Sequence, residues 1–288
     1  MYHIHVAGDK VGQGDKRLHK KRISAAGDIG RHPSDYSSGR CPEQWRQDAI
    51  CMGEGEDALF EYIQSLRSDR NRYDMKNLCF IKEGSIVLNP LRDRIEDLDS
   101  LPYPDWELFY GPPNNDVSYA EFLASRGCPF SCAYCAEERL RNLYQKRKIR
   151  FKSPEHLIEE ICAFRERYPN LSFIFFQDDN LNLYKDWLTR FCDLYKKRID
   201  IPFGCNLHYN LIDEETVATL KTAGCFRIHV GVETGNENLR KNILNKNISN
   251  ATIIKSSSLL KNAASGSGRL TCWEYQPRKR KICWRLYG

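Results

Sequence analysis

The sequence predicts an α/β fold with a parallel sheet, because apolar, strand-like runs alternate with amphipathic helical segments of about ten to fifteen residues. Leu171 to Phe176 is the clearest strand, since its nearly continuous apolar run is typical of strands buried on both faces. Ser153 and Pro154 have the residue types of a helix N-cap and a first helical position. In such sheets, functional residues gather in the loops beyond the carboxyl ends of the strands.

The regular elements begin near residue 117. Asp213 is a second predicted N-cap, and Gly224 is expected to end the helix that follows it. In chain order we expect a strand at 117–125, a helix at 154–168, a strand at 171–176, a helix at 184–195, a strand at 201–207, a helix at 214–223, a strand at 226–232 and a helix from 236.

The two ends of the chain lack this pattern. Residues 8–48 are rich in Gly, Lys, Arg, Ser and Asp, and no helix or strand is predicted over 264–288. Gly53 to Leu66 is predicted to be a turn followed by a helix. We therefore expect four parts: an incomplete N-terminal α/β remnant at 1–70, a connector at 71–116, the core at 117–262 and an irregular basic tail at 263–288.

Composition favours a cytoplasmic enzyme with neither a nucleic-acid nor a membrane partner. The apolar runs are too short to span a bilayer, and the first ten residues contain no apolar signal-peptide core. The formal net charge of +6 comes largely from short basic runs. Such runs are more often solvated faces than nucleic-acid sites, and no interleaved aromatic pattern accompanies them here.

Three of the twelve cysteines are clustered, and the rest are scattered. Cys128, Cys132 and Cys135 lie within eight residues directly after a predicted strand. Closely spaced thiolates suit an iron–sulfur cluster or zinc. Three ligands suit a four-iron cluster with one open iron, whereas structural zinc takes a fourth protein ligand, and none follows at the usual finger spacing. A non-catalytic zinc or iron–sulfur binding module remains the alternative.

The cysteine motif, with Tyr134 before its last cysteine, resembles that of the radical S-adenosylmethionine (SAM) enzymes. The resemblance implies a partial (βα) barrel in which Cys128, Cys132 and Cys135 hold a [4Fe–4S] cluster whose open iron binds SAM. Reductive cleavage of SAM would give methionine and a 5′-deoxyadenosyl radical, while the protein supplies orientation. The resemblance also implies a small-molecule substrate and a low-potential electron donor such as a flavodoxin or ferredoxin.

Two further stretches resemble the same family. Phe175 to Asn180 ends the second barrel strand, where relatives place polar residues near the methionine amino group. Gly231 to Gly235 ends the fourth strand, where relatives place a polar residue near the ribose or the methionine. A helix cap and a turn are the structural alternatives. The residues that the resemblance implies for SAM binding are Tyr134, Asp178, Asp179 and Glu233.

The segment from Gly53 to Leu66 and the proline-ended connector resemble the junction after a cobalamin-binding domain. Proteins of this subgroup carry out methyl transfer or ring formation. The roughly 50 residues before Gly53 are too few for a complete doubly wound sheet. Cobalamin is therefore expected as a cofactor of the intact relative. We expect this chain to be a truncated or frame-shifted copy, with the edge of its fourth strand unpaired and its activity lost through the truncation.

Overall fold

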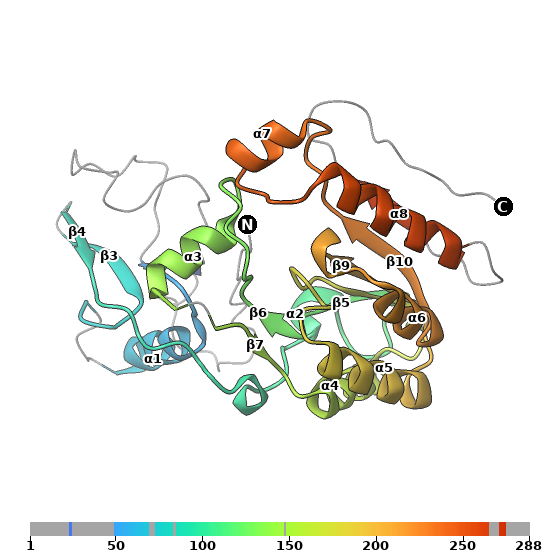
Figure 1. Cartoon of the computed structure of the whole chain (residues 1–288). Coiled ribbons are helices and arrows are strands. Elements are labelled where there is room, and N and C mark those ends of the chain that lie inside the picture. Colours follow the sequence, from blue (N-terminus) through green and yellow to red (C-terminus); the bar gives the residue numbers. More distant parts are fainter. Residues whose placement is uncertain are drawn as a thin grey trace. The chain divides into compact units, whose positions relative to one another are not determined.

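The structure is a computed structural model that describes residues 23–24, 49–68, 73–82, 85–146, 148–264 and 271–274 (Figure 1). Contacts divide the chain into two compact units. One contains residues 1–95 and 142–145, and the other contains residues 96–141 and 146–288. The prediction for residues 8–48 falls almost entirely outside the described residues.

The first unit contains a four-stranded sheet in the order β1-β2-β3-β4. β1 (Ile23–Ser24) is parallel to β2 (Ala49–Cys51), whereas β3 (Leu78–Lys82) is antiparallel to both β2 and β4 (Ser85–Leu88). Helix α1 (Glu56–Arg67) begins shortly after Gly53, whose φ of 78° makes the predicted turn. The small core of this unit consists of Ala49, Ala58, Tyr62, Leu78 and Phe80.

The hairpin of β3 and β4 differs from the expected connector at 71–116. It is paired with β2 in the N-terminal sheet. The two strands have five and four residues, which is too short to show a periodic pattern. Only their backbone hydrogen bonds to neighbouring strands, which cannot be seen in the sequence, show that both strands belong to the sheet.

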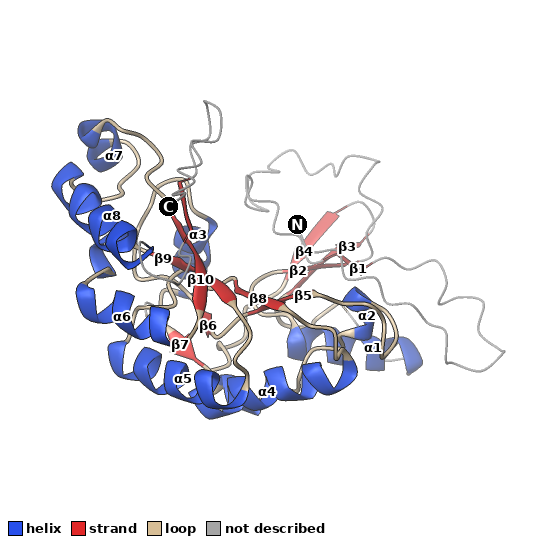
Figure 2. Cartoon of the chain, turned by 90° about the vertical axis from the view of Figure 1, so that its right-hand side faces the viewer, coloured by secondary structure: helices blue, strands red, loops and turns tan. Residues whose placement is uncertain are grey.

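The second unit contains five parallel strands in the order β11-β10-β9-β8-β5. Helices cover the outer side of this sheet, as Figure 2 shows. The strands are β5 (Tyr119–Phe122), β8 (Phe173–Phe176), β9 (Phe203–Leu207), β10 (Cys225–Val230) and β11 (Thr271–Glu274). The longer helices are α4 (Pro154–Arg167), α5 (Lys185–Arg198), α6 (Glu214–Thr222) and α8 (Asn250–Ala264). The predicted α/β class with a parallel sheet is confirmed.

Shorter elements connect these layers. A two-stranded antiparallel ladder joins β6 (Ser125–Arg126) to β7 (Arg150–Phe151). The helical segments are η3 (Leu98–Ser100), α2 (Glu107–Tyr110), α3 (Ala136–Tyr144), η4 (Tyr209–Leu211) and α7 (Glu237–Asn242). No helix among the described residues is long and apolar enough to cross a membrane.

The predicted helix ends are confirmed. The side chain of Ser153 accepts a hydrogen bond from the backbone N–H of His156, and Pro154 occupies the first turn of α4. Asp213 caps α6 in the same way through the N–H of Thr216. Gly224 follows α6 with a φ of 94°, a left-handed conformation that glycine adopts without strain.

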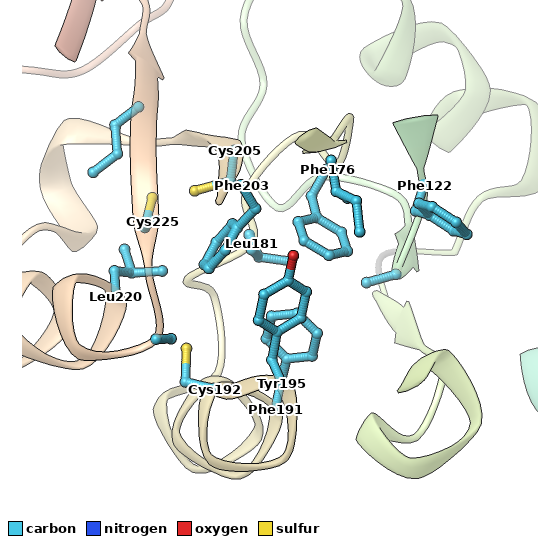
Figure 3. Close-up of a cluster of buried hydrophobic side chains, with 14 of the residues drawn as sticks. Phe122, Phe176, Leu181, Phe191, Cys192, Tyr195, Phe203, Cys205, Leu220 and Cys225 are labelled. Carbon is cyan, nitrogen blue, oxygen red and sulfur yellow. The ribbon is translucent and has the colours of Figure 1, made fainter. Parts of the chain in front are cut away.

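An aromatic cluster fills the space between the sheet and its helices (Figure 3). Phe176, Phe191, Tyr195 and Phe203 are each fully buried, and the rings of Tyr195 and Phe203 lie 4.8 Å apart. Burying one such side chain stabilises the fold by about 1.5–3 kcal/mol. The thiols of Cys192, Cys205 and Cys225 pack here as small apolar groups, as predicted.

Strand β11 corrects the prediction for the C-terminal segment. The sequence predicts no strand after residue 263 and an unpaired fourth strand, whereas Thr271–Glu274 pairs in parallel with Arg227–Val230 of β10. Four residues are too few to show a period, although Thr, Cys and Trp suit a strand. Residues 265–270 and 275–288 of the expected tail lie outside the described residues.

Candidate functional site

The loop that carries the three clustered cysteines follows β6 and contacts the residues beyond the carboxyl ends of two neighbouring strands, β8 and β9. Gly127, with a φ of 99°, turns the chain into this loop. After β8, Asn180 donates a hydrogen bond to the sulfur of Cys128 over 3.2 Å. After β9, the ring of His208 stacks on that of Phe130 with centroids 3.6 Å apart. The cysteine loop, residues 128–135, therefore lies where a parallel sheet gathers its functional residues.

The segment after α7 holds the other side of the cysteine loop. The N–H of Ala133 donates to the carbonyl of Leu244 over 2.9 Å, and the Asn245 side-chain amide donates to the Ser131 carbonyl over 2.7 Å. Asn245 has a φ of 49°, a conformation that asparagine tolerates better than most residues. Two hydrogen bonds thus fix the middle of the loop to a segment that is distant in sequence.

Arg141 of α3 holds the cysteine loop through several hydrogen bonds. Its guanidinium donates to the carbonyls of Pro129 and Phe130 and, over 2.7 Å, to the hydroxyl of Ser131. It also pairs with Glu138, and only 9% of its side chain is exposed. A guanidinium offers five donors in a rigid plane, so one residue can fix three consecutive positions of a loop.

The three thiols are free and partly or fully enclosed. Burial raises the pKa of Cys128 to about 11 and also raises the pKa values of Cys132 and Cys135. Hydrogen bonds oppose these rises, whereas the charge of Asp179 and, to a smaller extent, that of a second cysteine add to them: Cys135 for Cys128, and Cys132 for Cys135. Cys135 therefore lies within electrostatic reach of both other thiols.

Thiols with raised pKa values stay protonated until a cation compensates the thiolate charge. Among the described residues, no group of three or more Cys, His, Asp or Glu side chains already lies close enough to hold a metal ion. The donor set nevertheless fits a four-iron cluster, because three soft ligands come from one loop. Cluster binding would require the sulfurs to close on the iron.

One flank of the loop combines Tyr134, Glu233 and Lys246. The Tyr134 hydroxyl lies near Glu233 and Cys132, and burial, more than the neighbouring Glu233, raises the pKa of Tyr134. Glu233 has a φ of 65°, and its carboxylate lies 3.1 Å from the ammonium of Lys246. The positive charge of Lys246 opposes the rise in the pKa of Cys132.

The other flank contains Asp179 and Glu137. Part of the Asp179 side chain is exposed, but the protein atoms around its carboxyl group exclude water, and this burial raises its pKa. Its charge in turn raises the pKa values of Cys128, Cys135 and Glu137, so it lies beside both thiols. The pKa of Glu137 rises to about 7, mainly through burial, while Arg150 acts in the opposite direction.

Asp178 is directed away from these residues, toward the chain just before the cysteine loop. It is 1% exposed, and its carboxylate accepts hydrogen bonds from the N–H of Ala124 and from the hydroxyl of Ser125. Its own carbonyl accepts from the side chain of Asn206. The structure thus brings Tyr134, Asp179 and Glu233 to the cysteine loop and directs Asp178 toward the link between β5 and β6.

Sequence reasoning missed several residues that shape this site. Asn180 stands directly after the two aspartates, so its place beyond β8 was an available signal. Arg141, Asn245 and Lys246 gave no such signal, because their roles depend on contacts with distant segments.

Comparison with a family model places residues 122–272 within the Radical SAM superfamily. This match covers slightly more than half of the chain. An uncharacterized methyltransferase of Pyrococcus horikoshii is 27% identical over 192 residues, which cover 65% of this chain and 40% of that protein. An anaerobic magnesium-protoporphyrin IX monomethyl ester cyclase of Rubrivivax gelatinosus is 26% identical over 214 residues, covering 69% and 36%. The chain spans about two fifths of the length of these curated relatives.

Solved structures share the fold. The radical S-adenosylmethionine methyltransferase TsrM from Kitasatospora setae superposes with a TM-score of 0.58 at 14% identity, covering 80% of this chain and 45% of that one. The cobalamin-dependent S-adenosylmethionine radical enzyme OxsB gives a TM-score of 0.59 at 21% identity, covering 78% and 33%.

Proposed function

Because the chain belongs to the radical SAM superfamily, we propose that Cys128, Cys132 and Cys135 hold a [4Fe–4S] cluster used for the reductive cleavage of SAM. When bound, the cluster supplies the electron that breaks a carbon–sulfur bond of SAM and yields a 5′-deoxyadenosyl radical. The observation that carries the proposal is the cysteine loop itself. It presents three free thiols at the carboxyl edge of a parallel sheet and is anchored from three sides.

The anchors support this use of the loop because they fix its backbone before any iron binds. Arg141 and Asn245 donate to the backbone carbonyls of residues 129–131, and Asn180 donates to the sulfur of Cys128. A ligand set held by its supporting contacts loses less conformational freedom when the group is bound. Cys132 is also largely shielded from water, since it is only 9% exposed.

We propose that Tyr134, Asp179 and Glu233 contact SAM and that Asp178 supports them. Carboxylates on both flanks of the loop can accept charge-assisted hydrogen bonds from an ammonium or ordinary ones from hydroxyls. Asp178 has both carboxylate oxygens engaged by the β5–β6 link, which favours a role in fixing the strand end.

The relatives suggest the later reaction. One is described as a methyltransferase and the other as a cyclase, and the solved structure of OxsB is that of a cobalamin-dependent enzyme. We therefore propose methyl transfer or ring formation on a small-molecule substrate, with electrons from a flavodoxin-like or ferredoxin-like donor. We also propose that the described part of residues 1–70 belongs to a cobalamin-binding-like domain, since OxsB is a cobalamin-dependent enzyme.

Anaerobic reconstitution with iron and sulfide tests the cluster. We expect about four irons per chain and a brown chromophore, both lost when Cys128, Cys132 and Cys135 are replaced by alanine. Cys162→Ala is the matched control, since Cys162 lies half-buried on α4 away from the loop. Full occupancy by zinc under these conditions, or iron binding that survives the triple replacement, would refute the proposal and favour the metal-binding module.

Cleavage of SAM is tested separately with the reconstituted protein and a low-potential reductant. We expect 5′-deoxyadenosine to form even without substrate, and Glu233→Gln to weaken SAM binding while leaving the iron content unchanged. Glu215→Gln on the exposed face of α6 serves as the control. A loaded cluster that yields no 5′-deoxyadenosine would contradict the assignment.

A further inference from the structure

A buried ion pair stands at the end of β10, beside the cysteine loop. The Glu233 carboxylate and the Lys246 ammonium lie 3.1 Å apart, with 14% and 9% of their side chains exposed. Gly231 makes room for this pair, because a side-chain atom at that position would overlap both charged groups. The pair is therefore a built feature of the site rather than a surface contact.

Arg240 folds the segment that delivers Lys246. Its side chain is fully buried and donates to the carbonyls of Thr234 and Ile248 and to the side chain of Asn250. The backbone N–H of Lys246 donates to the carbonyl of Arg240 itself. One guanidinium thus closes the chain between β10 and α8 into a fixed turn, which sets the position of the Lys246 backbone.

Glu233 adopts a backbone conformation that is rare for glutamate. A φ of 65° lies in the left-handed region, which a residue with a long side chain occupies only when its surroundings enforce it. Its carboxylate accepts a hydrogen bond from the Lys246 ammonium, and the Tyr134 hydroxyl lies close enough for Glu233 to raise the pKa of Tyr134. The Glu233 carboxylate therefore has a charged neighbour and a phenolic neighbour.

We infer that Lys246 is a positioning residue, whose ammonium orients the Glu233 carboxylate for the hydroxyl or ammonium donors of SAM. The inference rests on the proposed function, in which Glu233 contacts SAM. An oriented acceptor binds more tightly, because the entropy of fixing its side chain is lost on folding rather than on binding. Lys246 acts only through Glu233, so its effect on SAM affinity should vanish when Glu233 is replaced.

The test measures SAM affinity by calorimetry on the anaerobically reconstituted full chain. We expect Lys246→Met to weaken SAM binding about tenfold, which corresponds to about 1.4 kcal/mol. Iron content and the visible spectrum should not change, and the maximal rate of 5′-deoxyadenosine formation at saturating SAM should stay within about twofold. Lys246→Arg should restore most of the affinity. Lys241→Met, on the exposed face of α7, is the control.

A double-variant cycle separates positioning from direct contact. We expect the combined Glu233→Gln and Lys246→Met protein to bind SAM no more weakly than Glu233→Gln alone. Additive losses would overturn the inference, because Lys246 would then contact SAM independently. If circular dichroism shows that Lys246→Met does not fold, Lys246→Gln is measured by the same criteria.

The failures of the two proposals are distinguishable. Wild-type affinity in Lys246→Met together with weakened binding in Glu233→Gln would overturn the positioning role and leave the SAM contact of Glu233 standing. Wild-type affinity in Glu233→Gln would overturn that contact and the positioning role with it. Failure of Lys246→Arg to restore affinity in a folded, iron-loaded protein would also refute the inference.

Discussion

Replacing Asp178 with asparagine should remove a defined pH dependence from the stability of the protein. Asp178 is buried next to the start of the cysteine loop. Burial raises its pKa from 3.8 to about 6, although the hydrogen bonds from Ala124 and Ser125 act to lower the pKa. Such a pKa difference between the folded and unfolded chain corresponds to about 3 kcal/mol. Asparagine has a similar shape and cannot ionise, so the variant lacks this contribution.

The sign follows from proton binding. Because the pKa is higher in the folded state, the folded protein holds more protons than the unfolded chain between about pH 4 and pH 6. The free energy of unfolding therefore falls across this window in the wild type, by about 3 kcal/mol from this group. Above this window the buried, ionised carboxylate continues to lower the free energy of unfolding of the wild type. The free energy of unfolding of Asp178→Asn should therefore increase relative to that of the wild type as the pH rises, and this difference should become constant above about pH 7.

The assay is urea unfolding of both proteins at a series of pH values, followed by circular dichroism. The difference between the two free energies of unfolding cancels the other titrating groups, including Glu137 and Asp179. Cys205, which senses the charge of Asp178, has a pKa far above this window. A difference that stays constant within about 1 kcal/mol from pH 3.5 to pH 7.5 would refute the electrostatic reasoning.

Three further changes test the fold. Ser153→Ala should lower the free energy of unfolding by about 1 kcal/mol through loss of the α4 cap, and an unchanged urea midpoint would contradict this. Gly204→Ala should lower the free energy of unfolding by about 1–3 kcal/mol because its methyl group overlaps the Phe175 ring. Gly235→Ala is the control, because its methyl group meets no atom within 4 Å; an equal loss of stability in both variants would refute the argument. Arg240→Met should lower stability by about 3 kcal/mol and reduce iron loading, and wild-type iron content would show that the turn does not support the loop.

The parts of the fold that depend on local physics were predictable from the sequence. The apolar run ending at Phe176 is buried as expected, and the caps at Ser153 and Asp213 make the expected hydrogen bonds. These features depend on residues within one or two turns of one another. The cysteine motif was predictable for the same reason, since its ligands lie within one short loop.

The remaining features depend on pairing between distant segments. Strand β11 and the β3–β4 hairpin are short, and only their backbone partners define them. The orientation of Asp178 toward β5 could not be separated in the sequence from that of Asp179, because both follow the same strand. Lys246 carries no local signal, and its partner Glu233 lies across a turn whose shape depends on Arg240.

The anchor between Ser131 and Asn245 has a consequence for the order of events during synthesis. These residues are separated by 114 positions, so the ribosome releases all three cysteines well before this particular anchor exists. At about 5–20 residues per second, this interval lasts roughly 6–23 s. During that time the loop has at most its contacts with Arg141, Asn180 and His208, and the contact from the segment after α7 forms last. A fully anchored loop therefore exists only after that segment has been translated, and the thiols of the nascent chain need a reducing environment until then.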